Sequence, residues 1–169
     1  MRGLAGAIAM LFALPGAAEV PGLGPVDTRR PVSPREEPFD AIVLIETTAG
    51  GRCTGALVAP RVVLTAAHCL VSSDASRLVP AADISVRLGG RNVHGRTLRS
   101  GPGFNPAREE PWRADWALVT LAAPLGDGHA LPLMREPPRQ GTPATLAAWQ
   151  YDQPDVLMAD RGCRVVLVG

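Results

Sequence analysis

The stretch from Arg52 to Leu70 constrains the fold of this chain more than any other part of the sequence. Two short apolar runs, 56–58 and 62–64, consist of residues that favour β-structure, and Pro60 lies between them. Short apolar runs interrupted by a turn residue are typical of a strand, a turn and a second strand. The stretch therefore predicts a β-hairpin-like unit.

Cysteines stand at both ends of this unit, with Cys53 opening the first run and Cys69 following the second. In an oxidising compartment the two thiols could form a disulfide. Closing a loop of this size contributes about 3 kcal/mol in the chain-entropy model. The bridge would staple the hairpin and hold the backbone of its neighbour, His68.

The rest of the chain is rich in short β-prone runs and shows no convincing helical pattern. Period-two alternation is clearest in Ile84–Leu88, and the region 122–143 contains so many Gly and Pro residues that it indicates a connection between two units. The pattern predicts an all-β barrel or sandwich. Strands are expected at 41–46, 84–88, 93–99 and 116–121, and in a second set at 145–149 and 163–168.

Two blocks of sequence resemble one known family. Thr65-Ala66-Ala67-His68-Cys69, with Cys53 sixteen residues upstream, resembles the histidine segment of the chymotrypsin/trypsin family of serine proteases. Asp115-Trp116-Ala117-Leu118-Val119-Thr120-Leu121 resembles the aspartate segment of the same family. The resemblance is to the bacterial type of this family, and it implies a trypsin-like double six-stranded β-barrel. A first barrel is expected at about 39–125 and part of a second at about 141–169, within a protease domain at 39–169.

The resemblance also implies catalytic roles in peptide-bond hydrolysis. His68 would be the general base and later the general acid, and Asp115 would accept a hydrogen bond from the Nδ1–H of that imidazole. Imidazole suits both tasks because its pKa in water lies near neutral pH. No Gly-Asp-Ser-Gly-Gly or near variant occurs in the 169 residues, and every serine precedes Asp115. We therefore expect that the substrate is a polypeptide and that the nucleophilic serine is missing from these 169 residues. Without it, the 169-residue chain should be inactive.

The third cysteine, Cys163, has no obvious partner in the sequence. In an exported protein this indicates either a free thiol or an absent partner. The chain stops soon after, inside the apolar run Arg164 to Gly169. We expect a C-terminal truncation, with a cysteine beyond the present end pairing with Cys163.

The N-terminus predicts export. One positive charge, an apolar run at 4–14 and small residues at 16–18 are typical of a secretory signal at 1–18, cleaved after Ala18 or Ala17. A buried N-terminal helix is the alternative interpretation, and the run is too short to span a bilayer. The following segment, 19–38, is a Pro-rich linker or extended arm. The mature protein is expected to be secreted or periplasmic, with no membrane anchor.

Charge and ligand patterns disfavour other function classes. The net charge is +1 and all 17 basic residues are scattered arginines, which argues against a nucleic-acid partner. His68 and the cysteines lack the CxxC or HExxH spacing of common zinc sites, so no metal or other cofactor is expected. His94 and His129 lie in polar, Gly-flanked contexts typical of solvated residues.

Two functions remain open from the sequence. The first is a serine endopeptidase, a hydrolase that uses a Ser-His-Asp triad. The alternative is a non-catalytic protease homologue that acts as a binding or scaffold protein. Retention of both His68 and Asp115 favours the enzyme, because neither residue has a catalytic use without a nucleophile.

Overall fold

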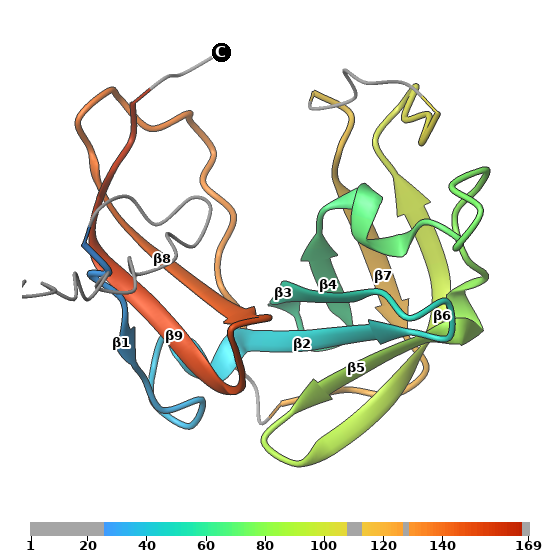
Figure 1. Ribbon diagram of the computed structural model, residues 1–169, viewed down its shortest axis with the longest axis horizontal. Coiled ribbons are helices and arrows are strands. Elements are labelled where there is room, and N and C mark those ends of the chain that lie inside the picture. Colours follow the sequence, from blue (N-terminus) through green and yellow to red (C-terminus); the bar gives the residue numbers. More distant parts are fainter. Residues whose placement is uncertain (1–25, 108–112, 127–128, 167–169) are drawn as a thin grey trace, which may run out of the picture.

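The computed structural model describes residues 26–107, 113–126 and 129–166 and consists of a barrel beside a smaller sheet (Figure 1). Six antiparallel strands close the barrel in the order β2-β3-β4-β7-β6-β5. This confirms the predicted all-β first barrel. Its strands are β2 (Ile42–Thr47), β3 (Arg52–Ala59), β4 (Val62–Thr65), β5 (Ile84–Leu88), β6 (Arg91–Ser100) and β7 (Ala117–Leu121).

Alternating side chains explain why these segments are strands. In β5 the residues Ile84, Val86 and Leu88 are buried while Ser85 and Arg87 between them are not, and β7 follows the same period of two. Side chains of a strand point alternately to its two faces, so one face of each strand fills the barrel. The buried core includes Val43, Ile45, Leu57, Val63, Ile84, Val86, Val119 and Leu121.

A three-stranded sheet, in the order β1-β9-β8, lies beside the barrel. It contains β8 (Pro143–Gln150), β9 (Gln153–Arg164) and the two-residue β1 (Arg30–Pro31). The arm at 19–38 is therefore not simply a linker, since β1 pairs with Met158 and Ala159 of β9.

One strand prediction is wrong. The last strand was expected at 163–168, but β9 begins at Gln153 and ends at Arg164. Pairing with β8 across a tight turn at Tyr151-Asp152 determines this strand, because Ala147 lies opposite Ala159 and Gln150 opposite Gln153. The polar residues and the proline at the start of β9 conceal it in the sequence.

The barrel and the small sheet are joined by both packing and hydrogen bonds. Phe39, Leu157 and Ala159 form a second buried cluster against which Trp149 packs. The Trp149 amide donates to Oγ1 of Thr54 on β3 at 2.9 Å. These contacts fix the small sheet against the β2–β3 side of the barrel.

The helices of the described residues are short 3-10 turns. They are η1 (Phe39–Ala41), η2 (Ala67–Leu70) and η3 (Ala81–Asp83). None of the helices in these ranges combines the length and the apolar composition that crossing a membrane requires. The predicted signal at 1–18 lies outside the described residues.

Candidate active site

The sheet order places the two predicted catalytic residues at one edge of the barrel. Strands β4 and β7 are antiparallel neighbours, and Thr65 at the end of β4 lies opposite Ala117 at the start of β7. His68 follows Thr65 by three residues and Asp115 precedes Ala117 by two. The two side chains therefore meet although 47 residues separate them.

His68 lies on a short helix with buried anchors. Helix η2 follows β4 directly, and its Ala67 and Leu70 are completely buried in the barrel core. These anchors turn the intervening His68 outward, and 63% of its side chain is exposed. The imidazole is thus held by a rigid backbone but remains accessible.

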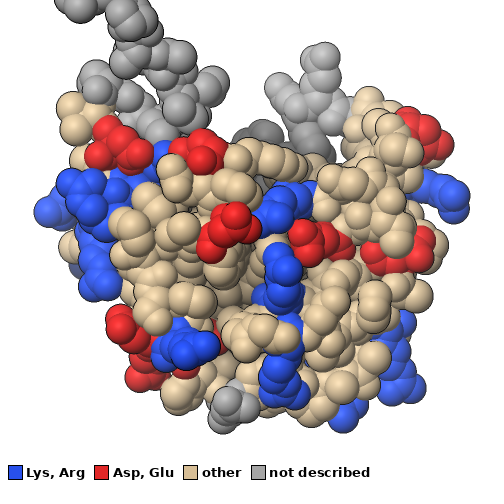
Figure 2. Space-filling view, turned by 60° about the horizontal axis from the view of Figure 1, so that its bottom comes forward, with Lys and Arg blue, Asp and Glu red and all other residues tan. Residues whose placement is uncertain are grey.

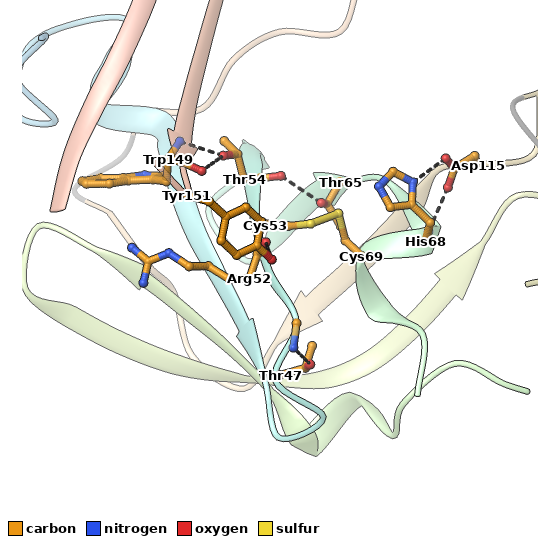
Figure 3. Close-up of a disulfide and its surroundings, with 11 residues drawn as sticks. Thr47, Arg52, Cys53, Thr54, Thr65, His68, Cys69, Asp115, Trp149 and Tyr151 are labelled. Carbon is orange, nitrogen blue, oxygen red and sulfur yellow. Dashed lines mark hydrogen bonds and ion pairs between the residues drawn. A yellow bond between two sulfur atoms is a disulfide. The ribbon is translucent and has the colours of Figure 1, made fainter. Parts of the chain in front are cut away.

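Asp115 contacts His68 at two points (Figure 3). Its Oδ2 lies 2.6 Å from Nδ1 of the imidazole, and its Oδ1 accepts the backbone N–H of His68 at 2.8 Å. A two-point contact fixes both the position of the carboxylate and the orientation of the ring. An ionised carboxylate can only accept at this position, so Nδ1–H is assigned as the donor.

The local charge balance keeps Asp115 ionised. Burial alone would raise the pKa of Asp115, since only 18% of its side chain is exposed. Hydrogen bonds from the His68 ring and from the amides of His68 and Ala67 outweigh burial, and the net pKa lies below the usual carboxyl value. An ionised Asp115 can stabilise the imidazolium that forms when Nε2 takes up a proton.

A disulfide lies next to this pair. Cys53 on β3 and Cys69 on η2 are joined by an S–S bond of 2.04 Å, with their Cα atoms 6.0 Å apart. Figure 3 shows the bridge between the strand that carries Thr54 and the helix that carries His68. The staple expected from the sequence is therefore present in the structure.

Cys53, His68 and Cys69 also lie close enough together to share a metal ion, but the disulfide occupies two of the three possible ligands. The ligand atoms of Cys53, His68 and Cys69 lie within 4.8 Å of one another. However, zinc binds cysteine as a thiolate, and the two sulfur atoms are bonded to each other. While the disulfide is intact, His68 is left as a single ligand.

No serine of the described residues forms a hydrogen bond with His68. Ser72 and Ser76 donate to Asp74, and Ser85 bonds to Asn92. Within the described part of the chain, the bond to Asp115 is the one that the ring makes, through Nδ1. Within these ranges the imidazole thus has no serine partner, while 63% of the His68 side chain is exposed.

Comparison with known families decides what this arrangement is. A model of the trypsin family matches residues 27–162, which include the barrel, the His68–Asp115 pair and most of the small sheet. The chain belongs to the trypsin family of serine proteases.

Curated relatives support the same assignment. The chain is 37% identical over 95 residues to the proclotting enzyme of Tachypleus tridentatus, covering 52% of this chain and 25% of that protein. It is 31% identical over 153 residues to human cathepsin G, covering 83% and 55% respectively. The glutamyl endopeptidase of Bacillus licheniformis is 27% identical over 110 residues, which are 62% of this chain and 34% of the enzyme. The matched part of this chain thus spans between 25% and 55% of the length of these relatives.

Solved structures show the same fold. A Glu endopeptidase in complex with MPD superimposes with a TM-score of 0.72 at 19% identity, covering 86% of this chain and 71% of that one. The VesB protease of Vibrio cholerae gives a TM-score of 0.60 at 22% identity, covering 79% and 43%. At these identities the likeness concerns the fold alone.

Sequence reasoning missed several residues that support the site. Thr54 accepts the Trp149 amide, and its carbonyl accepts the hydroxyl of the buried Thr65 at 2.9 Å. This chain of hydrogen bonds runs from the small sheet to the end of β4. A lone threonine in a β-prone run gives no sequence signal of such a role. The buried Arg29 was also missed, because one of its two partners, Asp152, lies 123 residues away in the sequence.

Proposed function

We propose that the protein is a secreted serine endopeptidase in which His68 and Asp115 are the base and the orienting acid of a Ser-His-Asp triad. The observation that supports this is the two-point contact of Asp115 with His68, which occupies Nδ1 and not Nε2, in a chain of the trypsin family. Export through the predicted signal at 1–18 agrees with the disulfide, since such bridges persist in oxidising compartments.

The proposed reaction is acyl transfer in two stages. A serine hydroxyl transfers its proton to Nε2 of His68 while its oxygen attacks the carbonyl carbon of the scissile peptide bond. The imidazolium then protonates the leaving amine nitrogen as the C–N bond breaks, and an acyl-enzyme remains. Water then attacks the ester carbonyl carbon and gives a proton to Nε2 of His68. The imidazolium returns this proton to the serine oxygen as the ester C–O bond breaks, which releases the acid and restores the serine.

Asp115 serves this cycle without exchanging a proton. It holds the Nδ1–H tautomer and stabilises the imidazolium at both stages. In this proposal the nucleophile is a serine outside the 169 residues, so these residues alone are catalytically inactive. Polypeptides are the substrate, and Cys163 pairs with a cysteine that is also outside the present sequence.

Kinetics of the complete protein with matched variants test this proposal. His68→Ala and Asp115→Asn are each expected to lower kcat by at least about 10³-fold, in line with the effects known for such triads. His94→Ala, which changes an exposed histidine on β6, should alter kcat by less than about twofold.

Two outcomes would contradict the proposal. Activity that survives His68→Ala would show that another residue is the base. A complete protein with no hydrolytic activity on any unfolded polypeptide would instead support the non-catalytic homologue.

A further inference from the structure

Two adjoining cavities form a groove on the face shown in Figure 2, away from the His68–Asp115 pair. Their volumes are about 330 and 490 Å³. Pro34, Arg35, Leu88 and Gly89 line both cavities, so they are two halves of one groove. The walls come from the arm, the β5–β6 turn and the β8–β9 sheet, and no residue of η2 lines them.

The floor of the groove is apolar. Leu44 and Leu88, which are 2% and 8% exposed, line it from the barrel. Trp149 lines the same half from β8. A ligand that enters this groove therefore meets apolar surface below and polar groups at the sides.

Both basic and acidic residues line the groove. Arg35 belongs to both halves, Arg87 to the first and Arg91 to the second. The first half also contains Asp155, and the second contains Asp40. Asp40 is already hydrogen-bonded to His129, another lining residue of that half.

Two of these arginines, Arg35 and Arg87, are incompletely neutralised by their neighbours. Among the described residues, the Arg35 guanidinium has no ion-pair partner. Arg87 is 49% exposed and lies 3.8 Å from Glu46, but Glu46 also pairs with Arg52 at 3.2 Å. One carboxylate thus serves two guanidinium groups. Figure 2 shows a column of basic side chains down the middle of this face, with acidic groups on both sides.

We propose that this groove is a binding site for a short acidic peptide segment of a protein partner, away from the His68–Asp115 pair. The glutamate or aspartate side chains of the segment would pair with Arg35 and Arg87, and its apolar side chains would lie on Leu44, Leu88 and Trp149. Guanidinium groups pair well with carboxylates, because their planar donors match two carboxylate oxygens.

The mixed lining favours a peptide over a polyanion. A nucleic acid or a sulfated polysaccharide carries an anionic group at every repeat and would be repelled by Asp155 and Asp40, which line the groove together with the arginines. A peptide can place its carboxylates against the arginines and neutral or apolar residues against the acids. The proposal concerns binding alone and does not depend on the proposed proteolysis.

Fluorescence anisotropy on the purified full chain tests the site. The probe is a labelled octapeptide of alternating glutamate and leucine, and its matched control has glutamine in place of every glutamate. We expect the glutamate peptide to bind at least about tenfold more tightly, with the difference shrinking as salt is raised. Arg35→Ala and Arg87→Ala should each weaken binding about fivefold to tenfold, which is within the range expected for the net loss of one hydrogen bond.

Arg96→Ala is the control variant, since Arg96 is an exposed arginine on β6 that lines neither cavity. It should change the affinity less than about twofold, and thermal unfolding should show that all variants are folded. Equal binding of the two peptides, no binding of either, or an equal effect of Arg96→Ala would overturn the proposal. Tight binding of heparin without binding of the glutamate peptide would also overturn it.

Discussion

Removing the Cys53–Cys69 disulfide should destabilise the protein strongly while leaving the catalytic pair in place. The bridge closes a loop with a sequence separation of 16 residues. The chain-entropy relation gives about 10 cal/mol/K for such a loop, which is about 3 kcal/mol at 25 °C. In a domain of this size that corresponds to a fall in Tm of roughly 6–12 °C.

The structure shows why the geometry should survive. Ala67 and Leu70 are fully buried on either side of His68, and Asp115 is held independently at the start of β7. Most of the effect of the bridge is therefore on the unfolded chain, whose freedom it restricts. The Cys53→Ala/Cys69→Ala double variant is expected to lose stability but to retain the bond between His68 Nδ1 and Asp115.

Guanidinium unfolding followed by circular dichroism measures the stability, and the imidazole ring proton in NMR reports the His68–Asp115 bond. Both proteins should carry Cys163→Ser, because a free thiol can exchange with the disulfide during unfolding. A stability loss below about 1 kcal/mol would refute the loop-closure reasoning. Loss of the His68–Asp115 signal in the folded variant would show instead that the bridge positions the histidine.

Two further predictions concern the arm and the support of Asp115. The Arg29 guanidinium lowers the pKa of Asp27 from its usual value of 3.8 to about 2. Between these two values the folded state binds fewer protons at Asp27 than the unfolded state does. The stability of the fold should therefore decrease as the pH drops from about 4 towards 2. In Arg29→Ala the pKa of Asp27, measured by NMR titration of its carboxyl carbon, should return towards the ordinary range. An unchanged pKa would contradict the role assigned to Arg29. In Gly101→Ala the new Cβ would clash with the carbonyl of Ala114, which precedes Asp115. Denaturant unfolding should show a decrease of about 1–3 kcal/mol in the free energy of unfolding. An unchanged free energy of unfolding would show that the loop adjusts at no cost.

The barrel was largely predictable because its strands carry their own signal. The run Ile84–Leu88 was predicted with the bounds that the structure shows, since three buried and two outward side chains alternate along it. The run 116–121 was also located to within one residue of β7. Burial of one strand face is a local property, and a sequence reports it directly.

The small sheet was less predictable because its strands depend on partners. Strand β1 has two residues, one of them Pro31, and is defined by its pairing with β9. Its neighbour Arg29 donates to Asp27 at 2.9 Å and to Asp152 at 2.6 Å. The second partner lies 123 residues away, and no local pattern indicates such a contact.

The candidate site falls between these cases. The blocks around His68 and Asp115 could be recognised from their residues, but their contact follows from the pairing of β4 with β7. Nothing in the local sequence of either block specifies that pairing. The groove between the arm and the β5–β6 turn was not predictable, because it is assembled from segments of both sheets.

Labelling of the native protein with a fluorophosphonate, followed by intact-mass measurement, tests the central proposal most directly. Fluorophosphonates react with serines that a neighbouring histidine activates, so the label reports a working triad. We expect one adduct on the secreted protein, attached to a serine outside the 169 residues. The His68→Ala variant should carry no adduct. A native protein that carries no adduct would contradict the proposed peptidase and would assign its function to binding.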